Sequence, residues 1–68
     1  MKNIFGKRVR ELRLNANLRQ VDLAKEFGVS KDAVSKWELG SETDFDTLIL
    51  IAKFFNVTTD YLLGLTDF

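Results

Sequence analysis

The sequence has 68 residues, 46% of them hydrophobic, and its ten basic and ten acidic side chains leave no net charge. Because it contains neither cysteine nor histidine, disulfides, the usual zinc ligand sets and the common acid-base and thiol groups are excluded, so we expect no metal, no cofactor and no enzyme activity. No targeting segment is evident and the longest apolar run, residues 48–52, is too short to span a membrane, so we expect a cytoplasmic protein.

Apolar residues recur at helical spacing almost throughout the chain, and no segment alternates as a strand would. The first helix is predicted from about Ile4 to Asn15, with an apolar stripe of Phe5, Val9, Leu12 and Ala16. A short second helix ends at Gly28, and its inner face holds Leu23, Ala24 and Phe27. The third helix ends at Gly40, and its inner face holds Val34 and Trp37.

The remaining apolar residues predict two more helices. The fourth carries a stripe of Phe45, Leu48, Ile49, Ala52 and Phe55, and a brief fifth contains Tyr61, Leu62 and Leu63. Ser30 and Thr58 are good N-caps because a hydroxyl can accept an amide of the next turn, whereas Arg19 is a poor cap for the second helix. With no proline and no low-complexity linker, residues 1–68 are expected to form one compact all-α five-helix bundle.

Residues 20–39, QVDLAKEFGVSKDAVSKWEL, encode two short helices joined by a tight turn at residues 28–30. These residue types at these spacings resemble the helix-turn-helix of the Cro/CI-type (XRE-like) regulator family. The resemblance extends to RVRELR before the motif, WELG at its end and NVTTDYLLG near the C-terminus. It implies a lambda-repressor-like DNA-binding domain whose second and third helices form the helix-turn-helix. A five-helix bundle without a DNA role is the alternative.

The third helix has a polar face opposite its core face on a helical wheel. This polar face holds Lys31, Asp32, Ser35 and Lys36. The resemblance implies that these four positions read bases in the major groove. The lysines can donate to guanine, Asp32 can accept from cytosine N4, and Ser35 can do either. From position alone a solvated face would look the same, and Asp32 could simply favour the first turn of its helix.

Phosphate contacts are expected on both sides of this helix. The resemblance implies that Gln20, at the start of the second helix, bonds a DNA phosphate. Further candidates are Ser30, Ser41 and, if its side chain turns toward the groove, Arg19. The resemblance also implies a structural ion pair that ties the first helix to the end of the third, formed by Arg13 and Glu38.

The chain departs from the family in two places. After Gly40 it reads SETDFD, so Glu42, Asp44 and Asp46 stand where the family usually has Lys or Arg, and Arg19 replaces a small hydroxyl residue. Residues 1–38 carry nine basic and five acidic side chains, and residues 39–68 carry one and five. This asymmetry is expected if one face of the domain binds a polyanion, although it could also arise by chance in so short a chain. We expect fewer phosphate contacts and a shallower salt dependence than is common in the family.

The resemblance also implies a homodimer, because such regulators usually bind as two-fold dimers. Candidates for an exposed apolar patch that two copies could bury are Tyr61, Leu65 and Phe68. Alternatively, Leu65 and Phe68 pack back onto the domain, or the natural chain continues beyond Phe68 into a linker and a regulatory domain.

Three functions fit these observations. The leading hypothesis is a sequence-specific transcriptional regulator, expected to be a repressor, that binds a palindromic operator in double-stranded DNA as a dimer, with its third helix in the major groove. The second is an antitoxin that uses the same helices on DNA and a further surface on a toxin protein. The third is a protein-interaction module that has the same fold but does not bind DNA. No part of the sequence suggests a pocket for a small-molecule ligand.

Overall fold

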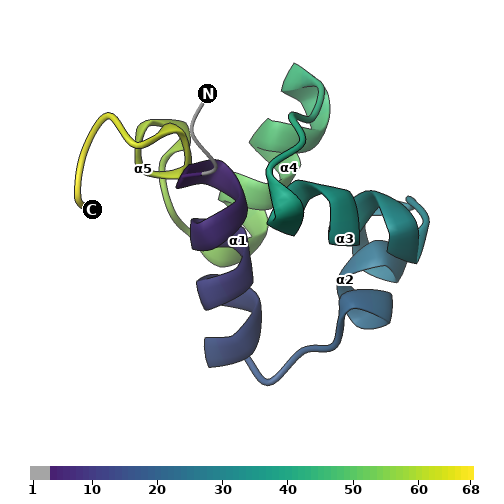
Figure 1. Cartoon of the computed structure of the whole chain (residues 1–68). Coiled ribbons are helices and arrows are strands. Elements are labelled where there is room, and N and C mark those ends of the chain that lie inside the picture. The colour runs from purple at the N-terminus through teal and green to yellow at the C-terminus, as the bar shows by residue number, and fades with distance from the viewer. Residues whose placement is uncertain (1–3) are drawn as a thin grey trace.

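The structure, a computed structural model, describes residues 4–68 and consists of helices and connecting loops, with no strand in that range. The helices are α1 (Ile4–Asn15), α2 (Gln20–Phe27), α3 (Lys31–Leu39), α4 (Phe45–Phe55) and α5 (Thr59–Leu63). In Figure 1, α2 and α3 lie on one side of α1, whereas α5 and the C-terminus lie on the other. The predicted all-α, five-helix fold is confirmed. Within residues 4–68 every helix is too short or too polar to cross a membrane.

Side-chain caps define where three of the helices begin. The hydroxyls of Ser30 and Thr58 accept the backbone amides three residues later, at 3.1 and 3.0 Å, which confirms both predicted caps. Asp44 caps α4 in the same way, with its carboxylate 3.0 Å from the amide nitrogen of Thr47. That cap was not among the predicted ones. At least one acidic residue of the segment between α3 and α4 therefore has a structural role.

Two glycines differ in why they are needed. Gly28 and Gly64 end α2 and α5 with φ angles of +67° and +82°, a region that side chains strain. A Cβ atom on Gly28 would meet nothing within 4 Å, but one on Gly64 would lie 2.9 Å from a methyl carbon of Ile4. The end of α5 can therefore approach the start of α1 only because residue 64 has no side chain.

The core is built from all five helices around a tryptophan. Its buried apolar residues are Phe5, Val9, Leu23, Ala24, Val34, Trp37, Leu48, Ile51, Ala52 and Leu62. The ring of Trp37 meets that of Phe5 edge-on at 6.4 Å and that of Phe27 at 6.5 Å between centroids. Trp37 thus joins α3 to α1 and α2, which holds the helix-turn-helix rigidly on the bundle. Ala16, predicted on the stripe of the first helix, lies beyond the end of α1 and is exposed.

The predicted core face of α4 is wrong in part. Leu48 and Ala52 are buried as expected, but Phe45 is 82% exposed and Ile49 is 44% exposed. Ile51, which the predicted stripe omits, is fully buried. Apolar residues occupy nearly every turn of α4 on several sides, so spacing could not select the inner face. Packing against α2 and α5 selects it instead.

Candidate nucleic-acid interface

The polar face of α3 projects from the bundle. Lys31, Asp32 and Lys36 are exposed and Ser35 is half-buried, while Val34 on the opposite face is fully buried. Within residues 4–68, no side-chain hydrogen bond or ion pair engages these four polar side chains. The face is therefore presented to solvent by a helix that the core holds in place, which is the arrangement that reading a groove requires.

The acidic loop after α3 does not cover that face with ion pairs. Glu42, Asp44 and Asp46 are exposed, and the ion pairs found within residues 4–68 do not include them. Hydrogen bonds from the hydroxyl and the amide of Thr47 hold the pKa of Asp44 below its ordinary value. Asp44 thus keeps its negative charge at neutral pH, while Glu42 lies in the loop after α3 and Asp46 in the first turn of α4.

Three polar side chains from three helices form one network next to the helix-turn-helix. Arg13 of α1 donates from Nε to Glu38 Oε2 at 2.6 Å and from its terminal nitrogen to Oε1 at 2.9 Å. Its other terminal nitrogen donates to the carbonyl of Leu18 at 2.9 Å. Gln20 of α2 donates from Nε2 to the same Glu38 Oε1 at 3.1 Å. The Arg13–Glu38 ion pair therefore links α1 to the end of α3 and also holds the first side chain of α2.

The protonation of this network follows from its hydrogen bonds. Burial raises the pKa of Glu38, but the hydrogen bonds from Arg13 and Gln20 and the nearby charges of Arg13 and Arg10 outweigh it, so the pKa lies below its ordinary value. The hydrogen bonds to Glu38 raise the pKa of Arg13, against the effect of its own burial. Both groups are charged at neutral pH. The exposed Arg10 was not predicted as a site residue, although its position three residues before Arg13 on α1 places it near this network.

The predicted phosphate contacts differ in how far their own hydrogen bonds leave them free to donate. One amide hydrogen of Gln20 is used by Glu38, which leaves the other free to donate. The hydroxyl of Ser30 accepts as a cap and keeps its own hydrogen, and Ser41 is exposed. Arg19 does not extend freely, because Asp22 binds its guanidinium at 2.9 and 3.0 Å. As DNA contacts, all four remain predictions.

The C-terminal residues are tied to α1. Arg8 donates to the backbone carbonyls of Tyr61 and Thr66, lies 3.8 Å from the carboxylate of Asp67, and stacks 4.2 Å above the Tyr61 ring. Tyr61 is therefore half-buried beneath a cation rather than fully exposed, and as a dimer contact it remains a prediction. Leu65 and Phe68 remain 74% and 90% exposed, so they do not pack back onto the domain.

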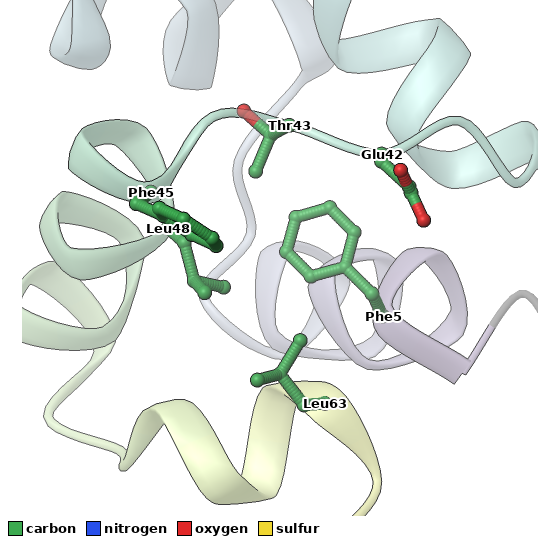
Figure 2. Close-up of a pocket in the computed structure, with 6 residues that line it drawn as sticks. All are labelled: Phe5, Glu42, Thr43, Phe45, Leu48 and Leu63. Carbon is green, nitrogen blue, oxygen red and sulfur yellow. The ribbon is translucent and has the colours of Figure 1, made fainter. Parts of the chain in front are cut away.

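A shallow apolar hollow of about 310 Å³ opens beside the acidic loop. Figure 2 shows the side chains of Phe5, Leu48 and Leu63 converging on it from three helices, with Phe45 and the loop residues at its edge. The hollow was not anticipated from the sequence. It lies where the first turn of α4 meets the loop of residues 41–44.

Comparisons with known proteins place this geometry in a family. Residues 9–62 match the helix-turn-helix family, which covers α2, α3 and the rest of the network described above. The chain is 43% identical over 61 residues to the HTH-type transcriptional activator BcrR of Enterococcus faecalis and 36% identical over 61 residues to repressor protein C2 of Salmonella phage P22. Each alignment covers 88% of this chain, but only 30% and 28% of those two longer proteins.

A solved structure shows the same fold. The chain superposes on a crystal structure of the P22 c2 repressor in complex with the synthetic operator 9T with a TM-score of 0.80 at 36% identity. The match covers 85% of this chain and 89% of that one.

Proposed function

The chain belongs to the helix-turn-helix family, and we propose on that premise that it is the DNA-binding domain of a transcriptional regulator. One observation carries the proposal. The polar face of α3 is exposed and unpaired within the described residues, on a helix whose opposite face is buried against α1 and α2. The similar P22 repressor, solved in complex with an operator, supports double-stranded DNA as the ligand. In this arrangement Lys31, Asp32, Ser35 and Lys36 would contact base edges in the major groove.

The start of α2 would hold the flanking phosphate. The network of Arg13, Glu38 and Gln20 fixes the Gln20 amide beside the base-reading helix and leaves one N–H unused. Such a contact sets the register of the protein on the duplex without reading sequence. Ser30 and Ser41, at the two ends of α3, would add phosphate contacts of the same kind.

The test begins by selecting bound sequences from a random duplex library. The triple variant with Lys31→Ala, Ser35→Ala and Lys36→Ala is then titrated against the selected duplex by fluorescence anisotropy. We expect affinity to fall at least about 100-fold, since each good base contact contributes about 1–3 kcal/mol. Circular dichroism should show an unchanged melting temperature, because none of the three side chains is buried.

A matched control removes positive charge elsewhere. Lys25→Ala with Lys53→Ala takes two exposed lysines from α2 and α4 and should lower affinity only slightly. Equal losses in the control and the triple variant would indicate bulk charge rather than base reading. Unaltered binding by the triple variant would disprove the assigned face. If the wild-type chain binds no duplex even at low salt, the protein-interaction alternative is favoured.

We further propose that the domain binds a two-fold operator as a homodimer and, as a regulator of DNA, works in the cytoplasm. Two exposed apolar surfaces could join the copies. One is the C-terminal pair Leu65 and Phe68, and the other is the α4 surface of Phe45 and Ile49. Two double variants distinguish these surfaces by analytical ultracentrifugation: Leu65→Ser with Phe68→Ser, and Phe45→Ser with Ile49→Ser. The double variant that converts the dimer to a monomer identifies the dimer surface. Monomers in the wild type, both free and on a selected palindrome, would contradict the dimer.

A further inference from the structure

Arg19 and Asp22 form a closed pair at the first turn of α2. The Asp22 carboxylate accepts from Arg19 Nε at 3.0 Å, from a terminal guanidinium nitrogen at 2.9 Å and from the Arg19 backbone amide at 2.9 Å. The guanidinium is thus occupied by a carboxylate of its own helix. It lies next in sequence to Gln20, where the phosphate contact of the proposed function is expected.

From this pairing we propose that Asp22 is a positioning residue that acts through Arg19 and limits the sequence-independent affinity for DNA, by neutralising the guanidinium and occupying the edge that would otherwise bind a DNA phosphate. The inference rests on the proposed function and adds to it. Asp22 lowers affinity for duplexes of every sequence and leaves the base contacts of α3 intact.

The geometry of the two groups makes them competitors. A guanidinium has five N–H donors, and the edge formed by Nε and one terminal nitrogen presents two of them in parallel. This edge fits a carboxylate or a phosphate equally well and engages one of them at a time. In Arg19 both oxygens of Asp22 already fill this edge, and their negative charge neutralises the guanidinium even though its other terminal nitrogen has no partner within the described residues. The hydrogen bonds of this pair hold the pKa of Asp22 at about 2, so the competitor stays ionised throughout the physiological range.

The exposure of the pair makes the competition adjustable. The side chain of Arg19 is 76% exposed and that of Asp22 is 30% exposed, so the guanidinium can exchange partners without disturbing the core. The bond from the Arg19 backbone amide to Asp22 does not involve the guanidinium and can persist after an exchange. Starting the helix and holding the cation are therefore separate roles of one carboxylate.

The experiment uses non-specific DNA, so that base reading cannot mask the effect. The wild type, Asp22→Asn, Arg19→Gln and the double variant are titrated against a mixed-sequence duplex across a range of salt concentrations. Asparagine keeps an oxygen for the Arg19 amide but removes the charge that holds the guanidinium. We expect Asp22→Asn to tighten binding about tenfold near 50 mM salt and to steepen the salt dependence by about 0.9, the effect of one added phosphate contact.

The double variant separates this mechanism from simple repulsion. Arg19→Gln alone should change affinity less than about twofold, because its guanidinium is withheld, and in the double variant it should abolish the tenfold gain. Glu26→Gln, an exposed carboxylate on the same helix that forms no ion pair within the described residues, is the control for the loss of one negative charge.

Each other outcome overturns the inference. If Asp22→Asn tightens binding equally with and without Arg19, or no more than Glu26→Gln does, the effect is repulsion. If Asp22→Asn weakens binding, Asp22 directs Arg19 toward DNA instead. If the wild type binds and Asp22→Asn leaves affinity unchanged, only this inference fails. If neither protein binds DNA at low salt, the proposed function fails and the inference with it.

Discussion

Replacing Glu38 with alanine is expected to be among the most damaging single changes to this domain. The side chains of Arg13 and Glu38 are only 10% and 5% exposed, and without Glu38 the Arg13 guanidinium keeps just the Leu18 carbonyl as a partner. Leaving one charge of a buried pair without its partner costs about 3–5 kcal/mol, and we expect the lower end because the pair lies at the edge of the core. A chain of this length has a total stability of roughly 3–10 kcal/mol.

Urea unfolding followed by the fluorescence of Trp37 measures this cost. With an m-value of about 1–1.5 kcal/mol/M, a loss of 3 kcal/mol lowers the midpoint by about 2–3 M. Arg13→Met combined with Glu38→Leu serves as the control, since it removes both charges and fills the space with apolar atoms. That double variant should recover most of the lost stability. A cost below about 1 kcal/mol for Glu38→Ala, or a double variant as unstable as the sum of the single ones, would refute the reasoning.

Three further predictions concern acid, glycines and the face of α4. Because folding lowers the pKa of Glu38, its ionised form stabilises the fold fully above its unfolded pKa of about 4.3, and this stabilisation is lost as pH falls through the folded pKa. The free energy of unfolding measured against pH should therefore decline in acid, and it should decline less in Glu38→Gln. Gly28→Ala should cost about 1–2 kcal/mol for its left-handed backbone alone, and Gly64→Ala more, because its methyl has no room; equal costs in urea unfolding would contradict this. Phe45→Ser should change stability by less than about 0.5 kcal/mol, whereas Ile51→Ala should cost about 2–5 kcal/mol, and thermal melts that reverse this order would contradict the assigned faces.

The number and order of the helices, and several of their ends, could be predicted from the sequence because local chemistry determines them. Ser30 and Thr58 mark helix starts by hydrogen bonds within one turn, and Gly28 marks an end by its own backbone conformation. The inner face of α4 could not be predicted in the same way. Ile51 and Phe45 are both apolar, and only the neighbouring helices distinguish the buried one from the exposed one.

In the candidate site, too, the features set by local sequence could be predicted and those set by the packing of helices could not. The outward face of α3 follows from its wheel, since Val34 and Trp37 leave only one orientation for the helix. The pairing of Arg19 with Asp22 involves residues three apart on one turn, so a local signal for it exists in the sequence. The bond from Gln20 to Glu38 joins residues 18 positions apart and depends on how α2 and α3 cross. Side-chain partners of that kind belong to tertiary structure and have no signature in spacing.

Arg8 affects how the molecule comes apart. Chain ends usually fray before the rest of a domain opens. Here the backbone carbonyls of Tyr61 and Thr66 accept hydrogen bonds from the Arg8 side chain of α1, which lies 53 and 58 positions earlier in the sequence. Releasing the C-terminal tail therefore also strips a cation from the Tyr61 ring and loosens the contact of α1 with α5. We therefore expect α1 and the segment after α5 to open as one cooperative unit, because the contacts of Arg8 hold both.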